Sequence, residues 1–231
     1  MPLVIHHLEK SQSERILFLC EELGLEYDLV KHDRNPETGR AQEDLSHVHW
    51  TGTAPVMVDN SSGDRQPITL AESAAIVEYI SQTHGGGRLV LTPKDQGYAD
   101  YLSWFHYSNG TLQPSLSRLM MLKRSGVPDD SPFPQMLRGK WDKGCKVMND
   151  VLGTRYYLAG DELTAADIMV VFTLTTMRGF CPMGLGNYPN LLSYLERIGQ
   201  REGYKRAMKK GDPELTPMLA ASVQPFQFGK R

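Results

Sequence analysis

The sequence has few cysteines, no strong excess of charge of either sign and no long apolar run. Its 231 residues hold 25 Lys and Arg against 27 Asp and Glu, a formal net charge of −2. This balance argues against a nucleic-acid partner, which needs a clustered basic face. The apolar run at 168–172 is far shorter than the ~20 residues that span a bilayer, so no membrane partner is expected. With 40% hydrophobic residues and no secretory signal pattern, the sequence predicts a soluble, globular, cytoplasmic protein.

The three cysteines, Cys20, Cys145 and Cys181, are widely spaced and form no C-x-x-C pair. This excludes a disulfide framework and argues against a zinc site. We interpret all three as structural residues. His47 and His49 have a spacing that metal ligands use, but no third ligand or carboxylate cluster accompanies them. No metal is therefore expected.

The first eighty-odd residues alternate between strand and helix signals. Strands are expected at 3–8, 26–30, 56–59 and 66–70, and helices at 13–23 and 71–83. The order βαβ and then ββα predicts a small mixed sheet whose first two strands are parallel. We therefore expect an α/β domain over residues 1–84.

The pattern changes at the glycines 85–87, which open an expected linker over residues 85–94. Beyond the linker, strand alternation stops and the sequence reads as helices. We expect them at 98–121, 135–152, 164–176 and 190–202, with a Pro- and Asp-rich loop at 125–134. Thr164 and Asp167 have the spacing of a capping box at the start of the most apolar helix. The fold class is thus α/β plus all-α, with an all-helical domain over residues 95–231.

Two serines lie between the first strand and the first helix. Ser11 and Ser13 occupy the carboxyl end of a strand beside a helix N-terminus, where ligands bind in open α/β sheets. A hydroxyl there could donate to a ligand thiolate and favour its ionised form. The alternative is an ordinary helix N-cap, most plausible for Ser13, with Arg15 as a charge on the helix surface.

Two further segments combine a strand or helix end with polar groups. The Ala54-Pro55 pair opens a strand, where proline often marks a bend or a cis bond that exposes main-chain groups to an extended peptide. Glu72 and Ser73 lie at the first turn of a helix, where an anion is stabilised. The alternatives are a turn proline and helix capping. Taken singly, each segment favours the alternative.

Five segments in register resemble the cytosolic glutathione transferases, especially fungal and bacterial members with a serine in the first loop. The segments are residues 7–15 (HLEKSQSER), 49–56 (HWTGTAPV), 70–76 (LAESAAI), 85–89 (GGGRL) and 160–168 (GDELTAADI). The resemblance implies a thioredoxin-like, glutathione-binding domain over 1–84. It implies that the helical domain over 95–231 forms the acceptor-substrate pocket, and that the protein is a homodimer.

The resemblance also implies roles for residues of the first domain. Ser11 would face the glutathione sulfur, with Ser13 as the other candidate. Pro55 would be a cis-proline, and the main chain of Ala54 would pair with the cysteinyl part of glutathione. With no tyrosine or cysteine in the first loop, the tyrosine-dependent mechanism is excluded, and the thiol-transferring classes are disfavoured.

Further candidates follow from the same resemblance. Glu72 and Ser73 would hold the γ-glutamyl group. Arg40 lies where some classes place a basic residue for the glycine carboxylate, and Thr53 replaces a common lysine. The acceptor pocket, which aromatic residues and methionines suit, would be drawn from Trp104, His106, Tyr107, Met120, Met121 and Phe172.

The function implied is the transfer of glutathione to a small hydrophobic electrophile, which includes electrophiles of secondary metabolism. One alternative is a glutathione-dependent cis–trans isomerase, in which thiolate addition to a conjugated alkene reverses after bond rotation. A second alternative is a non-catalytic, glutathione-binding regulatory protein. The two serines of the first loop favour an enzyme, because non-catalytic relatives often lose that hydroxyl.

Overall fold

The computed structural model describes residues 2–35, 37–41, 44–61 and 66–227. The chain divides into two compact units. Unit 1 comprises Met1–Leu89, Gln200–Thr216 and the chain from Gln227, and unit 2 comprises Val90–Gly199 and Pro217–Phe226. Within the described residues, no helix combines the length and apolar character that crossing a membrane requires.

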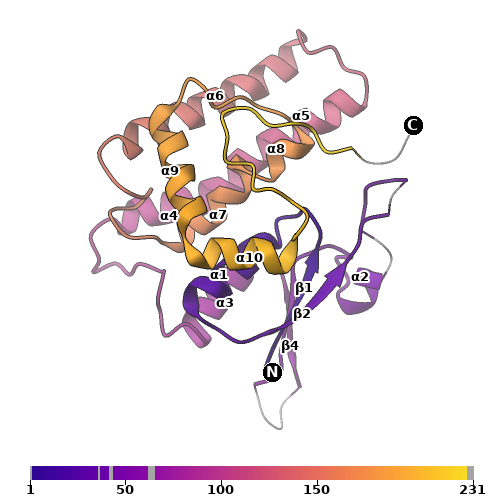
Figure 1. Cartoon of the computed structure of the whole chain (residues 1–231), viewed down its shortest axis with the longest axis vertical. Helices are drawn as coiled ribbons and strands as arrows, with labels where there is room; N and C mark the ends of the chain where they lie inside the picture. The colour runs from indigo at the N-terminus through magenta and orange to yellow at the C-terminus, as the bar shows by residue number, and fades with distance from the viewer. Residues whose placement is uncertain (1, 36, 42–43, 62–65, 228–231) are drawn as a thin grey trace. The chain divides into compact units, whose positions relative to one another are not determined.

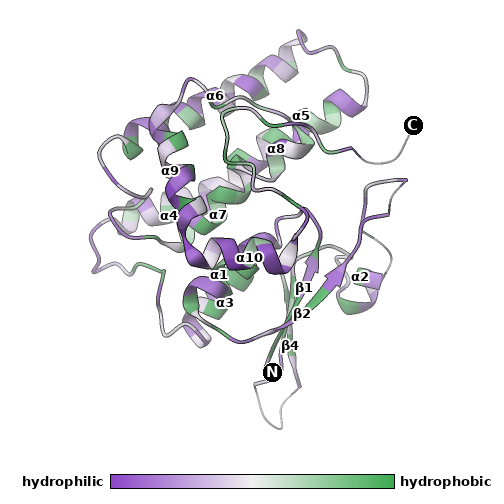
Figure 2. Cartoon of the chain, in the orientation of Figure 1, coloured by the Kyte–Doolittle hydropathy of each residue, from purple (hydrophilic) through white to green (hydrophobic). Residues whose placement is uncertain are grey.

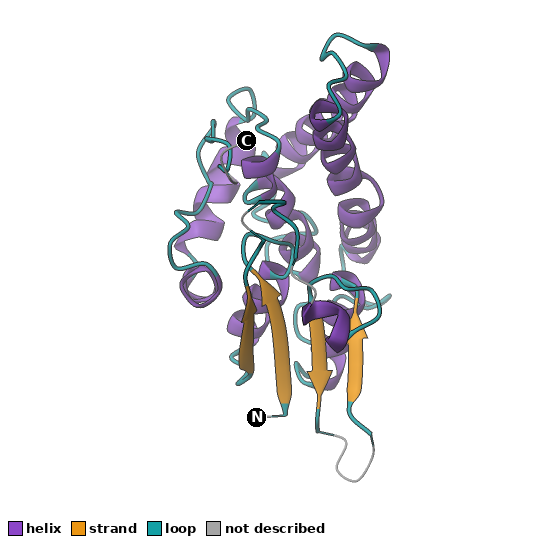
Figure 3. Ribbon diagram, turned by 90° about the vertical axis from the view of Figure 1, so that its right-hand side faces the viewer, coloured by secondary structure: helices purple, strands orange, loops and turns teal. Residues whose placement is uncertain are grey.

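Unit 1 is built on a four-stranded mixed sheet (Figure 3). Its strands are β1 (Leu3–Leu8), β2 (Asp28–His32), β3 (Val56–Asp59) and β4 (Ile68–Ala71), in the order β2-β1-β3-β4. β1 pairs with β2 in parallel, while β3 runs antiparallel to both β1 and β4. Side chains alternate across β1, so that Leu3, Ile5 and His7 are buried while Val4 and His6 are half-buried.

The described helices of unit 1 are α1 (Glu14–Leu23), α2 (Asp44–Val48), α3 (Ser73–Thr83) and α10 (Glu202–Gly211) (Figure 1). α1 ends at Gly24, whose φ of 66° is the left-handed conformation that glycine adopts freely. α1 contacts β1, α3 and α10. The sheet and α1 therefore hold the first loop, residues 9–13, between them.

α10 belongs to unit 1 although it comes from the far end of the chain. The guanidinium of Arg201 donates two hydrogen bonds to the Glu22 carboxylate, at 2.9 and 2.7 Å. The ring of Tyr204 packs edge-on against Phe18, with centroids 5.1 Å apart. A Cβ added to Gly203 would lie 2.5 Å from the Glu22 carboxylate, so glycine permits this close approach. These contacts bring the residues that follow α10 to the first loop.

The described elements of unit 2 are all helical. They are α4 (Tyr98–Tyr107), a π-helical turn η1 (Ser108–Leu112), α5 (Gln113–Arg124), α6 (Pro132–Leu152), α7 (Ala165–Leu174), α8 (Met177–Phe180) and α9 (Pro189–Gln200). Every residue of α7 is buried, and its ribbon is mostly green in Figure 2. The expected capping box is present: Asp167 accepts hydrogen bonds from the Thr164 N–H and hydroxyl, at 2.9 and 3.0 Å.

The predicted fold class is confirmed, while several element boundaries differ. The helix expected over 98–121 is interrupted by η1 and extends to Arg124. The short α2 lies between the second and third strands, where no helix was predicted. α10 was not expected, although Tyr204, Ala207, Met208 and Gly211 have helical spacing and are buried. Its many charged residues obscured that narrow apolar stripe.

Candidate functional site

Ser13 occupies the N-cap position of α1, but its side chain does not cap the helix. Its hydroxyl makes no capping hydrogen bond. Instead the Ser13 Oγ lies 2.9 Å from Nδ1 of His7, and it accepts a hydrogen bond from the Leu8 N–H at 3.2 Å. Ser13 has no exposed surface. The capping interpretation of this serine is therefore wrong.

Ser11 lies nearer the surface of the same loop. It is 7% exposed, and its Oγ lies 2.6 Å from the Ser13 Oγ. The Ser11 Oγ also accepts a hydrogen bond from the Ser13 N–H at 3.2 Å. Of the two serines, only Ser11 has accessible surface, so it is the one that a ligand at this loop can contact.

Arg15 occupies the interior of unit 1 rather than a helix surface. It is 1% exposed, and its Nη1 donates hydrogen bonds to the Ser73 hydroxyl at 3.0 Å and to the Gln12 side-chain oxygen at 3.3 Å. Burial lowers the pKa of the guanidinium to about 9, and the neighbouring Glu14 opposes this shift. Arg15 thus remains charged at neutral pH. The expectation of a surface charge at this position is wrong.

The Ala54-Pro55 peptide bond is cis and directly precedes β3. The Gln12 side-chain N–H donates to the Ala54 carbonyl at 3.4 Å. Ala54 is buried beside Leu8, while Thr53 is exposed. Through Gln12 and Arg15, the first loop, the segment before β3 and the start of α3 are connected by hydrogen bonds.

Glu72 is in an unusual conformation where β4 passes into α3. Its φ of 70° and ψ of 113° are sterically unfavourable for a residue with a Cβ. Its exposed side chain makes no capping hydrogen bond, and Ser73 is buried against Arg15. The capping interpretation therefore fails here as well. Strain of this kind is retained where the surrounding structure or a ligand requires it.

Arg40, the candidate for a glycine carboxylate, is exposed in the segment between β2 and α2. Its carbonyl accepts a hydrogen bond from the Asn35 N–H at 2.8 Å, which closes a short turn. No described contact joins it to Ser11 or Ser73. Hydrogen bonds thus join the candidates of unit 1 in two sets. Ser11 is bonded to Ser13, and Ser73 is linked to Ala54 by way of Arg15 and Gln12.

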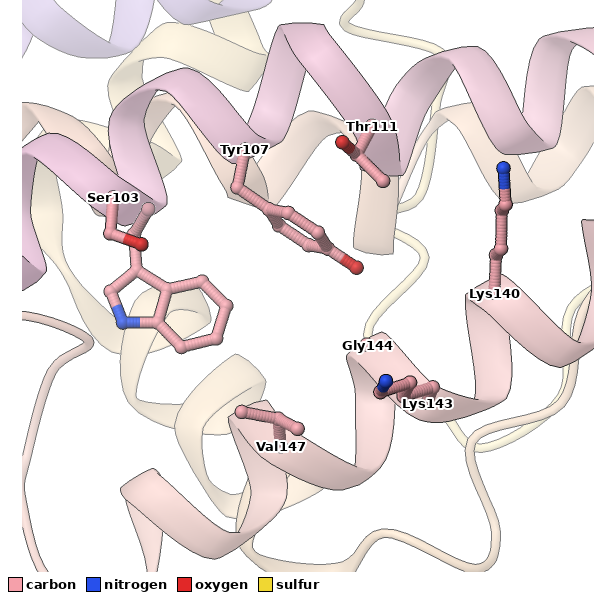
Figure 4. A pocket seen from close by; sticks show the side chains of 8 residues that line it. Ser103, Tyr107, Thr111, Lys140, Lys143, Gly144 and Val147 are labelled. Atoms are coloured by element: carbon pink, nitrogen blue, oxygen red, sulfur yellow. The ribbon is translucent and has the colours of Figure 1, made fainter.

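Unit 2 contains a cavity of about 400 Å³ between α4, η1 and α6. Its lining residues are Ser103, Trp104, Tyr107, Thr111, Lys140, Lys143, Gly144 and Val147. Figure 4 shows the Tyr107 ring pointing from α4 toward α6. A Cβ at Gly144 would lie 2.3 Å from the Tyr107 hydroxyl oxygen, so glycine makes room for this ring.

Of the six acceptor-pocket candidates, only Trp104 and Tyr107 line this cavity. Met121 is 63% exposed and His106 is also exposed. Phe172 is 3% exposed within α7, so its side chain is part of the core of unit 2. Sequence reasoning did not name the two lysines of the cavity, because lysines on a helix usually form a solvated surface.

Comparisons with known proteins identify the family of this chain. Residues 11–83 match the family model for the glutathione S-transferase N-terminal domain, and residues 131–211 match that for the C-terminal domain. The chain belongs to the glutathione S-transferase family. The N-terminal match includes Ser11 and Ser13 of the first loop, the Ala54-Pro55 segment and the start of α3.

Several relatives within the family are similar over most of their length. Glutathione S-transferase 1 of Saccharomyces cerevisiae is 28% identical over 91% of this chain and 96% of its own. The disulfide-bond oxidoreductase YfcG of Escherichia coli is 26% identical over 85% of this chain and 89% of its own. A glutathione S-transferase structure from Actinobacillus pleuropneumoniae superposes with a TM-score of 0.79 at 27% identity, covering 94% of this chain and 98% of that one.

Another family structure, from Pseudomonas fluorescens, contains two bound glutathione molecules. It shares the fold of this chain, with a TM-score of 0.72 at 18% identity over 89% of this chain and 92% of that one.

The three cysteines of this family member are all buried and free of disulfides. Burial raises the pKa of each thiol, that of Cys20 to about 12. The ionised form of each is therefore disfavoured at neutral pH, and none is placed to act as a nucleophile. No group of three or more His, Cys, Asp or Glu residues in the described part of the chain is arranged to hold a metal ion.

Proposed function

We propose that this chain is a glutathione transferase that holds glutathione at unit 1 and joins its sulfur to a small hydrophobic electrophile. One observation carries the proposal. The buried Arg15 contacts both Gln12 and Ser73, and Gln12 contacts Ala54, so three distant segments are joined in one hydrogen-bonded network. An extended peptide with a charged end fits the polar groups that this network holds together.

The groups present match the parts of glutathione. The N-terminus of α3 and the Ser73 hydroxyl suit the α-carboxylate of the γ-glutamyl residue, because free N–H groups and the helix dipole favour an anion there. The exposed Glu72 carboxylate suits the adjacent ammonium group. The main chain at Ala54, beside cis-Pro55, suits the cysteinyl amide. For the glycine carboxylate, Arg40 remains the candidate, and Thr53 is a further glutathione-binding candidate.

Ser11 would supply the chemical contribution of the protein. A hydroxyl that donates to the ligand sulfur stabilises the thiolate and increases its fraction at neutral pH. Ser13 has no accessible surface, so it would act only through its hydrogen bond to Ser11. Glutathione brings the reactive sulfur, which agrees with the burial of all three cysteines of the chain.

The cavity of unit 2 is our candidate for the acceptor-binding surface. Trp104 and Tyr107 offer aromatic contact area, and Lys140 and Lys143 would favour an anionic group on the acceptor or its product. The other candidates, His106, Met120, Met121 and Phe172, do not line this cavity. A small electrophile with an aromatic ring and an acidic substituent is the acceptor class that these residues suit.

The decisive experiment measures conjugation of an aromatic electrophile to glutathione by wild type and Ser11→Ala. We expect kcat/KM to fall on the order of 100-fold in the variant, the size of effect seen when one preorganised donor is removed. Ser193→Ala, which changes an exposed serine of α9, serves as the matched control. Equal rates for wild type and Ser11→Ala would remove Ser11 from the mechanism.

Assays with glutathione and an aromatic electrophile, a conjugated alkene or a disulfide separate the alternatives by their products. Conjugation gives a thioether, isomerisation returns glutathione and a rearranged alkene, and a regulatory protein binds glutathione without turnover. Disulfide-bond oxidoreduction, the activity named for the Escherichia coli relative, would reduce an added disulfide substrate to thiols and oxidise two glutathione molecules to glutathione disulfide. We propose conjugation as the main activity, by a cytoplasmic homodimer. Light scattering at several protein concentrations would test the dimer.

A further inference from the structure

The first loop is connected to the end of α10 by a chain of buried polar groups. Beyond Ser11 and Ser13 the chain continues to His7 on β1, whose Nδ1 lies 2.9 Å from the Ser13 Oγ. The other ring nitrogen of His7, Nε2, lies 3.3 Å from Oδ2 of Asp212, which is ion-pair distance. No other described residue is a partner of either of these two atoms.

Asp212 is held in place at the C-terminal end of α10. Its Oδ1 accepts a hydrogen bond from the Lys10 N–H at 2.9 Å, and its side chain is 5% exposed. Gly211, just before it, permits the approach, because a Cβ there would lie 3.1 Å from two atoms of the His7 ring. His7 is itself 1% exposed. Asp212 thus lies against the ring nitrogen of His7 that does not face Ser13.

When His7 is neutral, each hydroxyl of this series of polar groups can donate its hydrogen bond toward His7. Its proton is then on Nε2, facing Asp212, and Nδ1 accepts from the Ser13 hydroxyl. Ser13 accepts from the Leu8 N–H and from the Ser11 hydroxyl, and Ser11 accepts from the Ser13 N–H. One Ser11 lone pair is left to accept the proton of a ligand thiol.

When His7 carries a second proton on Nδ1, the hydrogen bonds are donated the opposite way, from His7 toward the ligand. Nδ1 then donates to Ser13, the Ser13 hydroxyl donates to Ser11, and the Ser11 hydroxyl donates to the ligand sulfur. Every hydroxyl and ring nitrogen of the chain has a role in both directions. The two arrangements differ in the position of one net proton.

We propose that His7 is the internal acceptor of the glutathione thiol proton, which reaches it through Ser11 and Ser13; this inference rests on the proposed function. The S–H bond breaks and its electron pair stays on sulfur, while a new O–H bond forms at Ser11. The original Ser11 proton passes to Ser13, and the Ser13 proton forms the N–H bond at Nδ1. The product is a thiolate that accepts from Ser11, with an imidazolium facing Asp212.

His7 acts through two serines and is therefore a positioning residue, so its test needs a readout besides turnover. We would titrate the ultraviolet absorbance of the thiolate in the enzyme–glutathione complex against pH. Asp212 faces His7 at 3.3 Å. The other charged or titratable residues in the wall of the cavity next to His7, which will contribute to the titration, are Glu9, Lys10, Lys31, His32, Asp33 and Glu214.

The variants His7→Asn and Asp212→Asn test this series of polar groups with little change in side-chain shape. In His7→Asn, the side-chain oxygen of the new asparagine can still accept from Ser13 but cannot take up a proton. We expect each variant to lower the thiolate fraction at neutral pH about 10-fold, with glutathione affinity within about two-fold of wild type. His6→Asn is the matched control, because His6 is the neighbour on β1 and its Nδ1 contacts His32 instead.

A measurement on wild type keeps the test valid if a variant fails to fold. Nitrogen NMR of the His7 ring is recorded with glutathione and with S-methylglutathione, which has no thiol proton. We expect Nδ1 to gain a proton with glutathione only. Thiolate formation with an unchanged Nδ1, or an unaltered titration in folded His7→Asn, would overturn the inference alone. Failure of wild type to bind glutathione or ionise its thiol would overturn the proposed function as well.

Discussion

Arg15 donates a hydrogen bond to the Ser73 hydroxyl at 3.0 Å, across 58 positions of sequence. The bond joins the first turn of α1 to the first turn of α3 inside unit 1. Because Arg15 is 1% exposed, this hydrogen bond is shielded from water and carries a full charge. It fixes the position of the hydroxyl that we assign to the γ-glutamyl group of glutathione.

Arg15→Gln should weaken glutathione binding about 10-fold, because a hydrogen bond from a charged group is worth roughly 1.5–3 kcal/mol. Calorimetric titration with glutathione measures the effect. Arg206→Gln is the control, since Arg206 is half-exposed and pairs with Glu21 at 2.8 Å, away from the first loop. If both variants bind as tightly as wild type, Arg15 does not organise the site.

Glu72→Gly should stabilise the ligand-free protein by about 1 kcal/mol, because glycine adopts a φ of 70° without steric cost. The same change should weaken glutathione binding, since the carboxylate is lost. Glu72→Gln removes the charge and keeps the strain, so it should weaken binding without the gain in stability. Urea unfolding and glutathione titration of both variants separate the two effects. A loss of stability in Glu72→Gly would show that the backbone here is not strained.

Asp59 should make the stability of unit 1 depend on pH in the acid range. Burial opposes its ionisation, but hydrogen bonds from Ser61, His84 and Tyr79 outweigh burial and lower its pKa to about 2. A carboxylate whose pKa is lower in the folded state stabilises the protein above its unfolded pKa, and this contribution is lost as pH falls through the folded pKa.

Asp59→Asn should therefore cost on the order of 2 kcal/mol at neutral pH. The difference from wild type should shrink as the pH falls from about 4 to about 2. Denaturant unfolding at several pH values measures both trends. A difference that is the same at all pH values would mean that the charge of Asp59 is not responsible.

Trp104→Ala should raise the KM for an aromatic acceptor about 10-fold, because a buried aromatic contact contributes roughly 1–2 kcal/mol. Gly144→Ala should have a similar effect, since its Cβ would displace the Tyr107 hydroxyl. Glutathione affinity should stay within two-fold in both variants. Met121→Ala, at a position that is 63% exposed and outside the cavity, is the matched control. An acceptor KM that responds to Met121→Ala and not to Trp104→Ala would place the acceptor elsewhere.

Much of the fold could be predicted because its signals are local. The alternation in β1, the apolar stripe of α1 and the Thr164–Asp167 capping box each depend on residues a few positions apart. α10 was missed, since its buried residues are separated by lysines and an arginine that suggest a solvated helix. Its partner is α1, from the opposite end of the chain.

The site could be predicted as a set of segments but not as a set of contacts. Ser13 and Glu72 occupy positions where capping is the usual role, and only their geometry shows that neither side chain caps a helix. The pattern predicts Arg15 as a surface charge, because helical spacing does not reveal what covers a given face of α1. Phe172, an acceptor-pocket candidate, belongs to α7 and is buried in the core of unit 2, as is every residue of this apolar helix.

The sequence by itself determined the change from an α/β to a helical region, the family segments, and the absence of a cysteine or tyrosine from the first loop. Only the tertiary structure decided which polar groups share an interior: Arg15 with Ser73, and His7 with Asp212. The physical reason is that local periodicity specifies the elements, whereas the packing of α3 and α10 on α1 brings distant groups within hydrogen-bond or ion-pair distance. The link from the first loop to the end of α10 follows from that packing.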